Sequence, residues 1–134
     1  MKLRIRGNSL RLRLGRGEVA ALVEFGNVEE ATEFGAGQRF EYALRTAADV
    51  SSPCASFRAG RIEVLLPTQL ARDWAAGQEV GISADQSLAA AGGPLAGSLR
   101  LLIEKDFACL NAPLNEEQAD AFPHPENAGC AADE

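Results

Sequence analysis

The segment that most constrains the fold is residues 1–16, in which apolar and basic side chains alternate on either side of Gly7-Asn8-Ser9. A period of two is typical of a β-strand, so each of the two runs has one apolar and one cationic face. Gly and Asn tolerate the positive φ of a tight turn, and the two runs therefore predict an antiparallel hairpin. Its cationic face carries the side chains of Lys2, Arg4, Arg6, Arg11 and Arg13.

This crowding of cations requires a compensating negative charge, because like charges opposite one another destabilise a strand pair by roughly 0.2–1 kcal/mol. One interpretation is that carboxylates on neighbouring strands neutralise the hairpin, and the candidates are Glu29, Glu33, Glu41, Glu63 and Glu104. A second is an anion-binding site, since the forked guanidinium donors of Arg4, Arg6, Arg11 and Arg13 match phosphate. An interface with another chain is a third.

The length and charge of the chain narrow the classes of protein that fit. A chain of 134 residues can bury the core of one compact domain. Its net charge of −6 makes nucleic acid an unlikely partner. No apolar run approaches the length of a membrane span, and three scattered cysteines do not form a disulfide framework. We therefore expect a cytoplasmic protein with reduced thiols and no membrane partner.

Further elements follow from apolar periodicity. A helix is predicted over residues 15–25, ended by Gly26-Asn27, and a second begins at Pro67 and ends at Gly77. Residues 46–55 are small and polar and are interpreted as a connector. Beyond the hairpin, strands are predicted over residues 28–34, 40–45, 61–66, 80–83 and 99–108.

The two halves of the chain have similar patterns. Superposing residues 10–14 on residues 62–66 places Leu22 on Trp74, which indicates an internal β-α-β-β duplication. The sequence thus predicts an α+β fold with a mixed, mostly antiparallel sheet of about six to seven strands. Two short helices would cover one face of this sheet and leave the other face polar.

The chain becomes acidic and Pro-containing near its C-terminus. We predict a single α+β domain over residues 1–111 and an extended tail over residues 112–134, in which Phe122 is the one aromatic anchor. Cys109, His124 and Cys130 could be metal ligands or a Cys-His catalytic pair. Their spacing fits neither, because no CxxC pair is present and the histidine lies in the tail.

A carboxylate pair is the remaining candidate for catalysis or metal binding. Alternation places Glu104 and Asp106 on one face of the last strand, although a solvated strand end explains the same pattern. No phosphate-binding loop or hydrolase motif is present in the sequence. We predict no catalytic residue, no metal ligand and no cofactor.

The opening LRIRGNSLRLRL, the later IEKDFACL and the FPHP that follows resemble a group of small bacterial proteins of unknown function. The resemblance covers nearly the whole chain and implies bacterial origin, but it carries no catalytic residue. The alternating charges are also similar to those of triphosphate-handling tunnel enzymes. Those enzymes begin with an acidic ExExK strand, whereas this strand is basic.

The sequence does not establish a function, and two hypotheses stay open. The first is a non-enzymatic binding or assembly module that meets a protein partner, or another copy of itself, through its polar sheet face or an edge strand. The alternative is a protein that binds a small anion or nucleotide on the arginine face.

Overall fold

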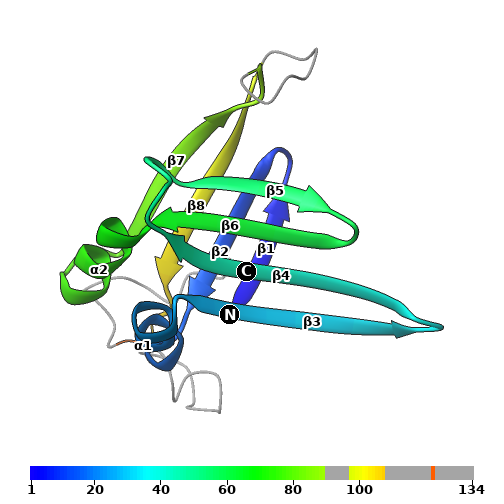
Figure 1. Cartoon of the computed structure of the whole chain (residues 1–134), viewed down its shortest axis with the longest axis horizontal. Coiled ribbons are helices and arrows are strands. Elements are labelled where there is room, and N and C mark those ends of the chain that lie inside the picture. The colour runs from blue at the N-terminus through cyan, green and yellow to red at the C-terminus, as the bar shows by residue number, and fades with distance from the viewer. Residues whose placement is uncertain (90–96, 108–121, 123–134) are drawn as a thin grey trace.

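The computed structural model describes residues 1–89, 97–107 and 122. This part of the chain forms eight strands and two helices (Figure 1). In order they are β1 (Lys2–Arg6), β2 (Ser9–Leu14), α1 (Arg16–Phe25), β3 (Asn27–Gly35), β4 (Gln38–Ala47), β5 (Cys54–Arg58), β6 (Arg61–Pro67), α2 (Thr68–Ala76), β7 (Gly81–Ser87) and β8 (Ser98–Lys105).

The strands form two sheets rather than the single sheet predicted from the sequence. Sheet I has the order β1-β2-β8-β7 and sheet II the order β3-β4-β6-β5. The two sheets lie face to face with their strands crossing (Figure 1). The α+β class and the two helices are confirmed. The predicted six to seven strands omitted β5, which includes the end of the segment interpreted as a connector.

The element order β-β-α-β-β occurs twice, first from β1 to β4 and then from β5 to β8. Each of these halves contributes its first hairpin to the sheet that contains the last two strands of the other half. The β1–β2 hairpin of the first half lies in sheet I beside β8 and β7 of the second half. The β5–β6 hairpin of the second half lies in sheet II beside β4 and β3. The central pairs, β2 with β8 and β4 with β6, are parallel, whereas the outer pairs are antiparallel. Each sheet is therefore built from both halves.

The core lies between the sheets and beneath the two helices. Both central pairs of strands supply it, as do Val19 and Leu22 of α1 and Ala71 and Trp74 of α2. Trp74 is 1% exposed, and its indole N–H donates to the carbonyl of Val80 at 3.3 Å. The largest fully buried aliphatic side chains of the described residues are Leu12, Leu14, Leu22, Leu44, Val64, Leu66, Leu101 and Ile103.

The ends of the helices have identifiable signals. The backbone N–H of Gly15 donates to the carboxylate of Glu18 at 2.9 Å, which satisfies a donor at the start of α1. Gly26 adopts a φ of 76° and ends the helix, where its N–H donates to Leu22. After α2, the carbonyl of Gly77 accepts a hydrogen bond of 2.9 Å from the ammonium of Lys105.

Lys105 is a buried cation at the end of β8. It is 7% exposed, and burial lowers the pKa of its ammonium. The Nζ atom lies 5.8 Å from the centre of the Trp74 ring and 5.5 Å from that of Phe122. Phe122 also stacks on Phe107, with ring centres 5.8 Å apart, and its N–H donates to Asp106. Phe122 is thus anchored against the domain, whereas the rest of the predicted tail, residues 112–134, lies outside the described residues.

Hydrogen bonds between side chains and backbone join the two sheets at two places. The side-chain amide of Gln86 in β7 both donates to and accepts from the backbone of Ala55 in β5, at 3.0 and 2.6 Å. On the other side, the hydroxyl of Tyr42 donates to the carbonyl of Met1 at 2.9 Å. The amino group of Met1 also forms an ion pair with Glu30 at 3.0 Å. Side chains thus link the two sheets at positions where no strand pairs across them.

Truncating the shared core should destabilise the whole fold. Leu44 is 0% exposed in β4, so Leu44→Ala is expected to lower the free energy of unfolding by about 2–5 kcal/mol. Leu70 of α2 is 36% exposed, and Leu70→Ala, the same change in chemistry, should cost less than about 1 kcal/mol. Urea denaturation of the two variants measures this difference. Equal losses would contradict the assignment of Leu44 to the core.

Candidate binding surface

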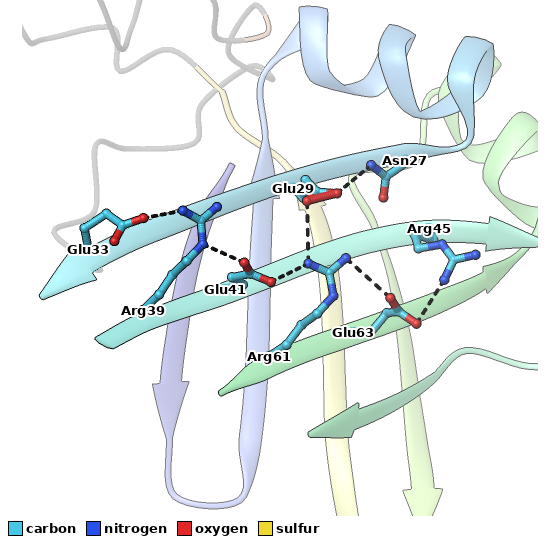
Figure 2. Close-up of polar contacts among 8 residues, drawn as sticks. All are labelled: Asn27, Glu29, Glu33, Arg39, Glu41, Arg45, Arg61 and Glu63. Carbon is cyan, nitrogen blue, oxygen red and sulfur yellow. Dashed lines mark hydrogen bonds and ion pairs between the residues drawn. The ribbon is translucent and has the colours of Figure 1, made fainter. Parts of the chain in front are cut away.

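The outer face of sheet II carries a continuous network of ion pairs (Figure 2). Arg61 of β6 lies at its centre. One terminal nitrogen of its guanidinium is 2.9 Å from Glu41 and 3.5 Å from Glu29. The other lies 3.5 Å from Glu63. Strand pairing explains this arrangement, because Glu41 is the register partner of Arg61 in the neighbouring strand.

Two further arginines extend the network along the sheet. Arg39 contacts Glu33 and lies 2.6 Å from Glu41, and Arg45 lies 3.0 Å from Glu63. Hydrogen bonds from Arg39 and then Arg61 lower the pKa of Glu41. Those same bonds raise the pKa of both guanidiniums. The carboxylate of Glu41 is therefore held in its charged form.

The outer face of sheet I differs because it carries the cationic hairpin. The register of β1 and β2 places Arg4 opposite Arg11 and Lys2 opposite Arg13, as the alternation predicts. Glu104 of β8 lies 2.8 Å from Arg11 and 3.7 Å from Arg13, so one carboxylate serves two guanidiniums.

Two other carboxylates lie at the borders of this face. Asp106 is 3.1 Å from Lys2, and Asp85 is 3.6 Å from Arg100. Lys2, Arg4, Arg11 and Arg13 all have interaction partners. Among the described residues, this face holds six cations, which are Lys2, Arg4, Arg6, Arg11, Arg13 and Arg100, against the carboxylates of Asp85, Glu104 and Asp106.

Three of the four arginines predicted to bind an anion lie around one depression. Arg4, Arg6 and Arg11 line it together with Ser9 and Leu102, and its volume is about 150 Å³. The hydroxyl of Ser9 donates to the carbonyl of Arg6 at 2.7 Å, which holds this residue in place at the turn. The fourth arginine, Arg13, lies further along β2 beside Glu104. The depression therefore brings three guanidiniums together on the outer face of sheet I.

The five carboxylates predicted to neutralise the hairpin are divided between the two sheets. Glu104 contacts the hairpin, as expected. The other four carboxylates, Glu29, Glu33, Glu41 and Glu63, lie on the outer face of sheet II and contact arginines of that sheet. Arg100 was not among the predicted site residues, although the alternation of SLRLLIEK places it on the same face as Glu104.

In the part of the chain that the structure describes, the other candidate residues do not form a metal-binding cluster. Glu104 and Asp106 contact cations, as above, and no group of three or more His, Cys, Asp or Glu is assembled within residues 1–89, 97–107 and 122. Cys54 is a half-buried free thiol in β5. Cys109, His124 and Cys130 lie outside the described residues.

Comparison with known proteins places this chain in a family. The model of a family of unknown function, DUF7009, matches residues 1–126, and the chain belongs to that family. This confirms the resemblance to proteins of unknown function. No curated protein and no solved structure matches the chain. In the described residues, no helix is long and apolar enough to cross a membrane.

The ion-pair network predicts a dependence of stability on pH. Hydrogen bonds from Asn27 and Arg61 lower the pKa of Glu29, and those from Arg39 and Arg61 lower that of Glu41. This stabilisation is present above the ordinary glutamate pKa of about 4.3 and is lost as the pH falls through the lower folded value. Arg61→Gln should therefore reduce the urea midpoint more at pH 7 than at pH 3.

Arg72→Gln is the matched control, because Arg72 is exposed on α2. Its effect on the midpoint should be small at both pH values. A loss in Arg61→Gln that is equal at pH 7 and pH 3 would contradict the assigned cause of the pKa shifts.

Proposed function

We propose that this protein is a non-enzymatic binding module whose outer face of sheet I meets an acidic surface of a partner protein. The observation that supports the proposal is the excess of cations on this face, six against three carboxylates in the described residues. An acidic partner would bring further carboxylates to a face on which cations such as Arg4 and Arg11 are register partners.

The contrast between the two sheets supports this choice of face. On sheet II the four carboxylates of the network form ion pairs with Arg39, Arg45 and Arg61, and Arg58, the register partner of Arg61, lies on the same face. A face that is neutralised internally offers little electrostatic attraction to a partner. The excess of cations that the described residues place on sheet I is the feature that would give a partner a preferred side and orientation.

The shape of the arginine depression favours a protein partner over a nucleotide. Its volume of about 150 Å³ is below the range of about 300–1,000 Å³ typical of pockets for small molecules. A net charge of −6 also disfavours a long nucleic acid, which would experience the whole molecule's field. Carboxylates of a folded partner would instead contact the guanidiniums one at a time.

A second candidate function is the binding of a single small anion, and a separate observation favours it. Arg4, Arg6 and Arg11 converge on one depression, and forked guanidiniums bind phosphate oxygens in pairs. Inorganic phosphate is small enough for this site. Bacterial origin and a cytoplasmic location, both expected from the sequence, remain predictions.

Removing two arginines at the depression should weaken binding to an acidic peptide. We expect Arg4→Gln with Arg6→Gln to lower affinity for an oligoglutamate peptide about tenfold at low salt, because two exposed charge pairs are lost. Arg39→Gln with Arg45→Gln removes the same charge from sheet II and should change affinity much less. Fluorescence anisotropy of a labelled peptide measures both.

Equal losses in the two double variants would overturn the proposal, because net charge alone would then explain binding. The proposal would also be overturned if the wild type did not bind the peptide at low salt. Competition by inorganic phosphate in the wild type, absent in Arg4→Gln with Arg6→Gln, would support the second candidate instead.

A further inference from the structure

An apolar pocket opens between the two sheets at the end of the molecule opposite the helices. Its volume is about 330 Å³, and its walls are almost wholly apolar. Both sheets supply the lining, which includes Ile5, Leu10, Phe40, Phe57, Ile62 and Leu99. This volume lies within the range of about 300–1,000 Å³ that small-molecule sites occupy.

The pocket is built from equivalent positions in the two halves of the chain. Ile5 pairs with Leu10 across the first hairpin, just as Phe57 pairs with Ile62 across the third. Both hairpins have two-residue turns, so each of these pairs lies one register step before the turn.

The parallel pairings extend the equivalence to the other two strands. Leu10 has Leu101 as its register partner, and Ile62 has Tyr42. Leu99 and Phe40 each lie two residues before these partners, and both line the pocket. The pocket therefore lies on the axis that relates the two halves.

The rim of the pocket combines exposed apolar side chains with guanidiniums. Ile5 is 56% exposed and Phe57 is 68% exposed, although both belong to strand faces that point toward the core. Arg6 follows Ile5 directly, and Arg58 follows Phe57. Both arginines are exposed and end an edge strand, so a long side chain there can reach the rim.

We propose that this pocket binds an amphipathic anion, a medium-length alkyl chain that ends in a carboxylate. The chain would displace water from the apolar walls and cover Ile5 and Phe57. The carboxylate would stay at the rim beside Arg58 or Arg6, because the walls offer it almost no polar partner. Arg6 also lines the depression on the outer face of sheet I, but the lining of the apolar pocket shares no residue with that depression. Binding of the alkyl chain therefore does not depend on the function proposed for that outer face.

Isothermal titration with a series of saturated carboxylates, each below its micelle concentration, tests the proposal. Each added methylene from hexanoate to decanoate should tighten binding about fourfold until the pocket is filled. Octanoate should bind more tightly than octanol, which has the same chain and no charge. Equal affinities for the two would overturn the assignment of the carboxylate to the arginines.

Variants at the exposed rim separate the contribution of the ligand's alkyl chain to binding from that of its carboxylate. Phe57→Ser should weaken octanoate and octanol alike, whereas Phe25→Ser should affect neither, because Phe25 is 73% exposed at the end of α1. Arg58→Gln with Arg6→Gln should weaken octanoate about fivefold and leave octanol unchanged. Arg72→Gln with Arg16→Gln, on the helices, removes the same charge and should change neither ligand.

Three results would overturn the proposal: no heat of binding for any carboxylate, affinity that does not depend on chain length, or equal effects of Phe57→Ser and Phe25→Ser. A dimer that light scattering detects and that Phe57→Ser dissociates would also overturn it, because a second copy would then occupy the pocket. Arg4→Gln should not alter octanoate binding, which distinguishes failure here from failure at the outer face of sheet I.

Discussion

The parallel pairing between the two halves of the chain is the constraint on which the rest of the structure depends. Leu12 of β2 has Ile103 of β8 as its register partner, and Leu44 of β4 has Val64 of β6. All four side chains are at most 2% exposed, as expected for central strands covered on their inner faces. Because each sheet takes one hairpin from each half, neither half contains a complete sheet or a complete core. The helices follow the same rule, since α1 and α2 each lead from one sheet to the other.

This symmetrical scaffold carries two outer faces of different character. The hairpin alignment makes Arg11 of β2 equivalent to Glu63 of β6 and Arg4 of β1 equivalent to Ser56 of β5. On sheet II the carboxylate at this position contacts two arginines of the same sheet, Arg45 and Arg61. On sheet I the same positions hold two guanidiniums opposite one another. Changing the charges on one face leaves the buried faces intact, because successive side chains of a strand point to opposite sides. The outer faces of the two sheets can therefore differ in charge with little effect on the stability of the fold.

The sequence predicts the local elements well because their signals are local. The alternation of Leu10, Leu12 and Leu14 is sufficient for β2, and helix-ending glycines fix the limits of α1 and α2. The strand β5 was missed because Phe57 is its one large apolar residue. Alternation shows which face of a strand is buried but not what covers it, so a second sheet could not be distinguished from helices. The same limit applies to the site. The arginine depression follows from the register of one hairpin, which is a local property of the sequence. The contact of Glu41 with Arg61 depends instead on the pairing of β4 with β6, and no local signal in the sequence specifies which strands become neighbours.

Connectivity also explains why the apolar pocket lies where it does. Each helix follows the second strand of a hairpin, after Leu14 in one half and after Pro67 in the other. The two helices consequently lie at one end of the core (Figure 1). Leu22 of α1 and Trp74 of α2 are buried there. The other end is spanned by turns such as Gly7-Asn8 and Ala59-Gly60, whose φ values of 54°, 52° and 76° at Gly7, Ala59 and Gly60 favour small residues. Such turns have no large apolar side chain with which to cover the core. An exchange of hairpins that closes one end with helices therefore leaves the opposite end open, and any molecule bound there contacts both halves of the chain.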